Sequence, residues 1–312
     1  MNDFFTLFPS LQEEKHLRAY VPGPFIVAGL PARDVKNLPF KRKYNNITLT
    51  LTGIEHVPYG KYGRLLLSII TTHAVLSKNS GNNTVTIEYN SLNQLLTELQ
   101  LPRSRGKEIR EQLEYFSKAT FVFEEKKTAS VQKQFFKNLF DEEDYIEFKD
   151  SVKATKLSTG VIPFMSQFHC IDVTDSVTKG TVAISFELSE QFTKYSREHS
   201  VPIDYTIYKE ISSPIGKDLY SWLVYRCNSL CDNEPLFIPS HSLIEQFMPV
   251  GEGCARNQEW RNYDYLKGLI QQIKEKYIPT LNITIQNEGI YLKKSKLPQI
   301  TDEHYVLVTS DL

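Results

Sequence analysis

One supersecondary pattern occurs twice in this 312-residue chain, and it limits the fold more than any other feature of the sequence. The first copy is clearest between Pro102 and Phe123. Ile109, Leu113 and Phe116 recur at helical spacing there and define one apolar stripe. A shorter, leucine-rich helical pattern precedes this helix across a turn, and a β-rich run follows it. Helix, turn, helix and hairpin is the order of a winged helix-turn-helix.

The second copy lies in the C-terminal third of the chain. A helical pattern over 215–230 is followed by a strand pattern over 235–239 and by a short helix from Ser240. A longer helical pattern over 256–277 leads into a predicted hairpin, in whose loop Gly289 takes the left-handed position. The duplication predicts an α+β fold with two tandem winged-helix domains, each a helix-turn-helix plus a β-hairpin wing.

The positions of the two copies also divide the chain. The expected segments are an N-terminal arm (1–45), a first winged-helix domain (46–150), a linker with a β-hairpin (151–188), a second winged-helix domain (189–297) and a C-terminal tail (298–312). Strand patterns at 119–125 and 144–149 predict the two strands of the first wing. The linker hairpin is expected to join 161–173 to 181–187.

Charge is balanced over the whole chain, so any nucleic-acid site must come from local segregation of charge. Lys plus Arg is 36 and Asp plus Glu is 37, which gives a formal net charge of -1. Each of the two longer helical patterns is nevertheless basic. Residues 103–118 contain five basic and three acidic residues, and residues 256–276 contain the same numbers, so each has a net charge of +2. Two basic helices, each ahead of a hairpin, predict two contacts with duplex DNA.

The side chains of these helices have the chemistry of base recognition. Arg pairs bidentately with guanine edges, and Asn or Gln pairs with adenine. The expected base contacts are Arg105, Arg110, Arg261, Asn262 and Gln271. Lysines at helix starts or on wings are expected to contact phosphates, and these are Lys107, Lys126, Lys127, Lys293 and Lys294. The predicted DNA-binding set is completed by Arg103, Arg256 and Lys267.

A simpler interpretation applies to part of the first helix. Lys107 and Glu111 stand four residues apart, as do Arg110 and Glu114, which is the spacing of ordinary surface ion pairs. The duplication of the pattern favours DNA binding over this alternative.

Catalytic motifs are missing from the sequence. Gly-Lys occurs at three places, but none is followed by Ser or Thr, so no ATPase phosphate-binding loop is expected. No two of the seven histidines stand close enough in sequence to form the metal-binding pair of a nicking endonuclease. The four cysteines form neither a paired framework nor a Cys-x-x-Cys motif. With no apolar run long enough to span a bilayer, we expect a cytoplasmic, non-enzymatic protein with free thiols and no metal or cofactor.

Four runs of residues resemble one known family. They are Pro58–Val75, Arg105–Phe116, Pro202–Ile211 and Ser213–Arg226. These runs are similar to plasmid-encoded replication initiators of the RepA type, and the resemblance covers roughly residues 46 to 296. The insert at 131–144 is a departure that has no counterpart in that family.

The resemblance implies a function. Initiators of this type bind repeated origin sequences (iterons) in double-stranded DNA through tandem winged helices, and they recruit the host initiator and helicase. It also implies a homodimer that represses its own gene and a monomer that starts replication. Two alternatives remain at this point: a transcriptional repressor of the same fold without an initiation role, and, less favoured, a nicking endonuclease.

Overall fold

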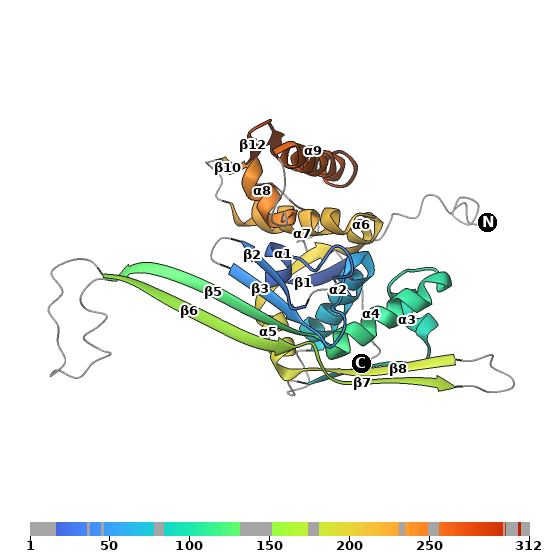
Figure 1. Ribbon diagram of the computed structural model, residues 1–312. Helices are drawn as coiled ribbons and strands as arrows, with labels where there is room; N and C mark the ends of the chain where they lie inside the picture. The colour runs from blue at the N-terminus through green and yellow to red at the C-terminus, as the bar shows by residue number, and fades with distance from the viewer. Residues whose placement is uncertain are drawn as a thin grey trace, which may run out of the picture.

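The computed structural model describes residues 17–35, 38–44, 47–77, 84–131, 152–173, 181–230, 235–248, 256–295, 297 and 305–306. These residues form a mixed helix-and-sheet protein (Figure 1), which confirms the expected α+β class. The first part of the chain contains β1 (Leu17–Pro22), α1 (Gly23–Val27), β2 (Phe40–Tyr44), β3 (Ile47–Thr52), α2 (Gly60–Leu76), β4 (Val85–Tyr89), α3 (Leu92–Glu98), η4 (Arg103–Arg105), α4 (Gly106–Lys118), β5 (Thr120–Val131), β6 (Val152–Pro163), β7 (Met165–Val173) and β8 (Thr181–Leu188). The second part contains α5 (Glu190–His199), β9 (Ser200–Asp204), α6 (Tyr205–Glu210), α7 (Pro214–Ser229), β10 (Leu236–Pro239), α8 (Ser240–Phe247), α9 (Arg256–Gln272), η7 (Ile273–Tyr277), β11 (Ile283–Ile285), β12 (Gly289–Leu292) and β13 (Tyr305–Val306).

Two of the sheets have the same strand order. The described strands form sheets with the orders β13-β1-β9, β2-β3-β5-β6, β4-β8-β7 and β10-β12-β11. In each of the last two, the strand that precedes the short helix pairs antiparallel with the second strand of a hairpin. The hairpin β7–β8 is therefore the counterpart of β11–β12.

The expected pairing of the first wing is wrong. β5 pairs with β6 over its whole length, from Thr120 opposite Pro163 to Val131 opposite Val152. The run 144–149, which was expected to be the partner, lies outside the described residues. Alternation of apolar and polar residues identifies strands but not their partners, so two hairpins with the same pattern cannot be told apart in the sequence. The β5–β6 ribbon extends away from the body of the molecule (Figure 1).

Segments expected to lie outside the two domains contribute to the sheets and the core. β6, β7 and β8 all come from the expected linker, and the hairpin expected there does form between β7 and β8. In the expected N-terminal arm, β1 pairs antiparallel with β9, with Ala19 opposite Ile203. Ala19, Val21 and Phe25 are buried, so this part of the arm is packed.

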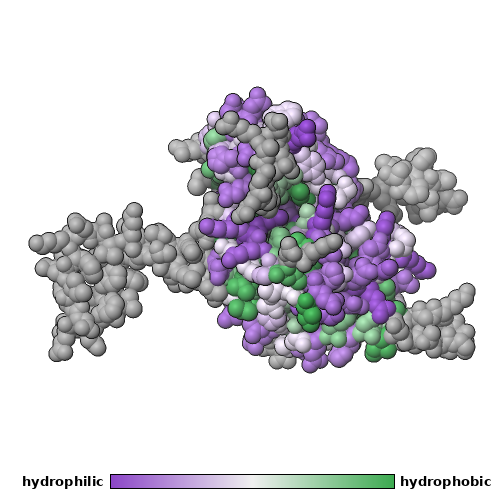
Figure 2. Space-filling view, in the orientation of Figure 1, coloured by the Kyte–Doolittle hydropathy of each residue, from purple (hydrophilic) through white to green (hydrophobic). Residues whose placement is uncertain are grey.

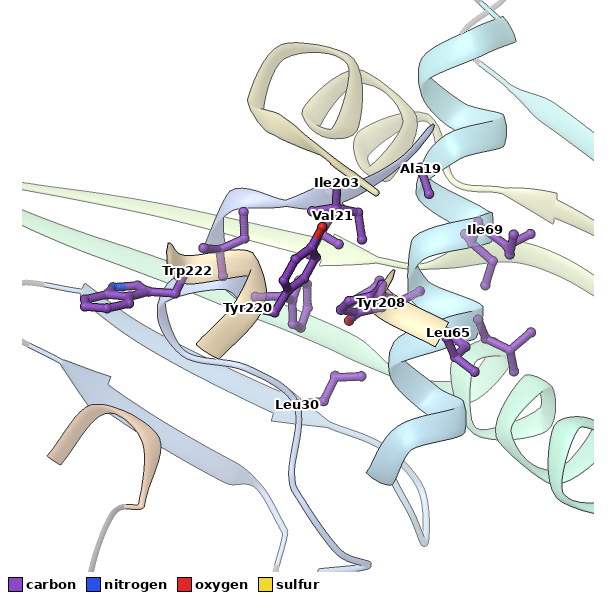
Figure 3. Packing of buried hydrophobic residues seen from close by; sticks show 14 of the residues in the cluster. Ala19, Val21, Leu30, Leu65, Ile69, Ile203, Tyr208, Tyr220 and Trp222 are labelled. Carbon is purple, nitrogen blue, oxygen red and sulfur yellow. The ribbon is translucent and has the colours of Figure 1, made fainter. Parts of the chain in front are cut away.

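The core continues across both halves of the chain. Figure 3 shows Leu65 and Ile69 of α2 beside Tyr208, with Tyr220 and Trp222 of α7 on the other side of the same cluster. All five side chains are buried. Burying a large apolar side chain stabilises a fold by about 1.5–3 kcal/mol, so this shared cluster joins the halves strongly.

A buried ion pair also connects α2 to α7. The Arg64 guanidinium donates hydrogen bonds to both carboxylate oxygens of Asp218, at 2.7 and 2.6 Å. It also donates to the carbonyl oxygens of Pro31 at 3.1 Å and Gly60 at 2.9 Å. Bidentate pairing combined with extra acceptors is the arrangement in which a buried charge is best compensated. The relative position of the two helices is therefore fixed by direction-dependent contacts as well as by apolar packing.

Two further cations lie close to this pair. Arg42 donates to the carbonyl oxygen of Ala28, and burial lowers its pKa to about 10, although the charge of Asp218 acts in the opposite direction. Lys217 donates to the carbonyl oxygen of Tyr208, and burial lowers its pKa well below the usual range. Arg64 in α2 and Lys217 in α7 are thus both buried basic residues, and each directly follows a glycine, Gly63 or Gly216.

Candidate nucleic-acid interface

The turn before α4 has a defined geometry. The Ser91 hydroxyl accepts a hydrogen bond from the Gln94 amide at 3.2 Å, so Ser91 is the N-cap of α3. At the other end Gln100 has a φ of 51°, and the amides of Gln100 and Leu101 donate to Thr97 and Leu96 at 2.9 and 2.8 Å. This is a Schellman motif, in which a left-handed residue ends the helix and satisfies its last carbonyls. The motif sets the angle at which α4 leaves α3.

The inner face of α4 holds the helix against the body of the protein. Ile109, Leu113 and Phe116 are each 0% exposed, which confirms the predicted stripe. Gln112 is also buried and accepts a hydrogen bond from the Tyr59 amide at 2.9 Å. Because these side chains fill one face, the basic residues of α4 are left on the other.

The basic residues of α4 lie outward, but most of them contact acidic neighbours. Arg103, Arg105 and Lys107 are exposed and Arg110 is half-buried. Three ion pairs connect Arg105 with Glu108 at 3.0 Å, Lys107 with Glu111 at 4.0 Å, and Arg110 with Glu114 at 3.6 Å. The hydrogen bond to Glu108 raises the pKa of Arg105. Figure 2 shows a largely hydrophilic surface over the region of α3 and α4. The ion pairs that the simpler interpretation expected are therefore present.

An aromatic side chain beside this face was not predicted. The Arg105 guanidinium lies 6.0 Å from the centre of the Tyr62 ring, and the Lys61 ammonium lies 4.9 Å from it. Both distances are in the range of a cation–π contact. Tyr62 therefore connects the start of α2 to the start of α4, and the Tyr-Gly-Lys-Tyr-Gly run was the only sequence signal for it.

The second basic helix forms as expected and continues to Tyr277. α9 covers Arg256–Gln272, and the last turn, Ile273–Tyr277, is a π-helix. Tyr263, Leu266 and Ile270 are buried against the body. The side chain of Arg256 is not among the described ones.

The outward side chains of α9 differ from those of α4. Arg261 and Gln271 are exposed and Asn262 is partly buried. Lys267 forms an ion pair with Asp264 at 2.7 Å, and the Gln271 amide donates to Glu275. Among the described side chains none forms an ion pair with Arg261. Trp260, which sequence reasoning did not select, is 65% exposed one residue before it.

The second hairpin follows α9 and ends in two exposed lysines. Lys293 and Lys294 come directly after β12, and the Lys293 amide donates to the carbonyl of Asn282 at 3.0 Å. Gly289 has a positive φ of 158°, a conformation that residues other than glycine rarely adopt, as expected for its position in the loop. The surrounding space also requires glycine, because a Cβ there would lie 2.2 Å from the carbonyl oxygen of Ile238 on the neighbouring strand.

Lys126 and Lys127 lie on β5, a strand of the sheet β2-β3-β5-β6. They are thus on a hairpin that is not the counterpart of β11–β12, and their side chains are not among the described ones. Apart from Lys126 and Lys127, the residues predicted to bind DNA therefore form two separate groups. One lies around α4, and the other lies around α9 with Lys293 and Lys294. In Figure 1, α2 and α7 lie between these two helices.

Among the described residues, no three His, Cys, Asp or Glu side chains are placed to hold a metal ion together. Within the same residues no helix has the length and apolar character needed to cross a bilayer. Cys170 and Cys227 are free thiols, and burial raises the pKa of Cys227 to about 11, so this thiol is an unreactive core side chain.

Each of two similarly ordered units thus carries an outward helix with basic side chains, and comparison with known families shows which class of protein this is. Residues 57–236 match the family described as "Plasmid encoded RepA protein". The match spans more than half of the chain, so the chain belongs to the plasmid-encoded RepA family of replication initiators, which confirms the resemblance seen in the sequence.

Two solved structures match this chain over most of their length. Domains 2 and 3 of RctB match with a TM-score of 0.46 and 9% identity, covering 81% of this chain and 86% of that one. The Pi initiator protein in complex with iteron DNA matches with a TM-score of 0.43 and 12% identity, covering 90% of this chain and 96% of that one. A comparison with curated proteins gives no match.

Proposed function

We propose that this protein is a sequence-specific, double-stranded DNA-binding initiator of plasmid replication that binds direct repeats (iterons) at its origin. The observation that carries the proposal is the repeated order of elements, in which each copy contains an outward helical segment, 103–118 or 256–276, of net charge +2. Membership of the RepA family supports the replication role.

The two DNA-binding units are winged helices in this proposal. The first consists of α2, β4, α3 and α4 with β7–β8 as its wing, and the second of α7, β10, α8 and α9 with β11–β12 as its wing. The common strand order supports this division, because a winged helix pairs its first strand with the last strand of the wing. The first unit thus extends to residue 188, beyond the boundary at 150 that the sequence predicted.

Each predicted residue has a role in this interface. Arg105 and Arg110 of α4, and Arg261, Asn262 and Gln271 of α9, contact base edges in two successive major grooves on one face of the DNA. Exposed lysines contact phosphates: Lys107 beside α4, and Lys293 and Lys294 after the second wing. Arg103, Arg256 and Lys267 add positive charge near the two helices. Lys126 and Lys127 are proposed to contact phosphates from the separate β5–β6 hairpin.

The host initiator and helicase are the proposed protein partners, and the protein itself has no catalytic role. Opening of an AT-rich tract follows from bending of the repeats, since flexible steps take up the deformation at the lowest cost. A homodimer that represses its own gene is proposed beside the monomer that starts replication. The host partners, the opening of the AT-rich tract and the dimer are all proposed from family membership.

A footprinting experiment tests the proposal. The full-length protein is titrated onto duplex DNA that flanks its own gene, and protection from hydroxyl radicals is mapped on both strands. We expect a regular series of protected direct repeats, each protected at two positions about one helical turn (roughly 10 base pairs) apart. Protection of only an inverted repeat over the promoter would instead indicate a repressor. Metal-dependent cleavage of one strand would contradict the non-enzymatic role.

A further inference from the structure

Gly268 in α9 lies where the packing of the described residues would also accept a larger side chain. Of the glycines inside the described helices, Gly63, Gly106 and Gly216 each lie where an added Cβ would come within about 3.0 Å of a neighbouring side chain, at 2.9, 3.0 and 2.9 Å. Close packing of helices therefore explains all three. Gly268 is different, because no atom of the described residues lies within 4 Å of the position of its Cβ.

This glycine also lowers the stability of the helix that contains it. It lies in the interior of α9, is exposed, and is followed by more than two turns of helix. Glycine in a helix interior is less favourable than alanine, because it loses more backbone freedom on folding. An alanine at this position would fit the open space and strengthen the helix. The packing of the described residues therefore does not account for Gly268, and a partner that approaches the exposed face of α9 would account for it.

The surroundings of Gly268 indicate what approaches it. Helical spacing places Arg261 two turns before it and Gln271 and Gln272 one turn after it on the same face, and all three are exposed. These are side chains that recognise base edges. Asp264, one turn before the glycine, is neutralised by Lys267 at 2.7 Å, so it does not repel phosphates. Glu275, two turns after the glycine on this face, accepts a hydrogen bond from the Gln271 amide, so both acids of the face are held by neighbouring donors. The remaining side chains around Gly268 suit a polar partner that presents base edges.

We propose that Gly268 is the point of closest approach between α9 and duplex DNA, where the helix backbone comes so near the groove that a Cβ is not accommodated. The proposal rests on the function proposed above. Gly268 sets the depth at which α9 enters the groove, and this depth lets Arg261 and Gln271 reach base edges from either side. Glycine is the residue that permits such an approach of a backbone to its ligand.

The variant Gly268→Ala separates this role from a structural one. We expect the melting temperature of the full-length protein to rise by about 1–3 °C, because the helix is strengthened. Affinity for a labelled duplex that flanks the gene should fall, by roughly 5- to 100-fold, because one methyl group overfills a close contact. Gly268→Leu should lower affinity further. Gln191→Ala is the control, since Gln191 is an exposed helical residue on α5, outside the proposed DNA contacts, and affinity should not change.

The outcomes are distinguishable from those of the proposed function. If Arg261→Ala weakens binding while Gly268→Ala binds as tightly as wild type, the role of Gly268 is overturned and the DNA-binding role of α9 stands. If neither variant weakens binding, α9 does not contact the DNA and both proposals fail. If Gly268→Ala leaves DNA affinity unchanged but alters self-association in sedimentation, the face contacts a second copy of the chain, which also overturns the proposal.

Discussion

The two copies of the pattern have the same order of helices, yet their sheets are assembled differently. In the second copy, β10, α8, α9, β11 and β12 follow one another directly, and the three strands form one sheet. In the first copy the long β5–β6 hairpin stands between α4 and the wing, and β5 and β6 pair with β2 and β3 instead. An extra hairpin that joins another sheet can thus be inserted after α4, because the following strands β7 and β8 still pair with β4.

The outward faces of the two helices differ in a second way. In α4 three of the basic side chains lie within 4.0 Å of an acidic neighbour. In α9 Lys267 is paired, while Arg261 has no ion-pair partner among the described side chains. An arginine that is already paired must give up that contact before it can bind a base. We therefore expect α9 to contribute more than α4 to the recognition of bases.

The largest effect is expected where the two copies meet. Arg64→Ala removes one partner of the buried pair and leaves Asp218 uncompensated, so the free energy of unfolding should fall by about 3–5 kcal/mol. Urea denaturation of the full-length protein measures this change. Arg105→Ala is the control, because Arg105 is exposed and its loss should leave the unfolding midpoint nearly unchanged.

The double variant Arg64→Met/Asp218→Leu tests the same contact in another way. It should recover most of the lost stability, because neither charge then remains buried. A loss below about 1 kcal/mol in Arg64→Ala would mean that apolar packing alone fixes the two copies to each other.

The next effect compares the two helices directly. Arg261→Ala should weaken binding to the repeat duplex by about 1–3 kcal/mol, which corresponds to roughly 5- to 150-fold. Arg105→Ala should reduce affinity by a smaller factor, because wild type must first break the contact of Arg105 with Glu108 at 3.0 Å. Fluorescence anisotropy at one fixed salt concentration gives both values. An equal or larger effect of Arg105→Ala would reverse the assignment of the stronger reader.

The lysines after the second wing should act on affinity without changing specificity. In the variant Lys293→Ala/Lys294→Ala, the slope of log K against log salt should become shallower by about 2, since each lysine releases roughly one counterion. The ratio of specific to non-specific affinity should stay the same. Lys194→Ala, in an exposed position on α5, is the control and should keep the wild-type slope. An unchanged slope in the double variant would remove these lysines from the interface.

The smallest effect concerns the weakest contact of α4. Glu111→Gln removes the pair with Lys107, whose nitrogen lies 4.0 Å from the carboxylate and whose side chain is 86% exposed. The free energy of unfolding should change by at most about 0.5 kcal/mol, as for exposed pairs in helices. Affinity for DNA should not fall, because a negative charge beside the phosphates is lost. Thermal unfolding and anisotropy check both points, and a clear loss of affinity would show that Glu111 itself contacts the DNA.

The sequence by itself determined the local structure of both copies. The apolar stripe of Ile109, Leu113 and Phe116 is buried as its spacing predicted, and the helix expected over 256–277 forms. The hairpin from the expected linker forms, and the motif resemblance identified the family. These features depend on residues within one or two turns of each other or on runs of specific residues, so the chain carries them directly.

Only the tertiary structure decided which strands pair and which charges meet. The partner of β5 is β6, and the hairpin that pairs with β4 comes from residues that the sequence assigned to a linker. Arg64 and Asp218 are 154 positions apart, and nothing in either motif indicates that they form one buried pair. Likewise, the sequence does not show that the described residues leave open space beside Gly268, whereas they pack closely against Gly63, Gly106 and Gly216. Contacts between distant segments depend on the packing of the whole chain, and local periodicity does not encode that packing.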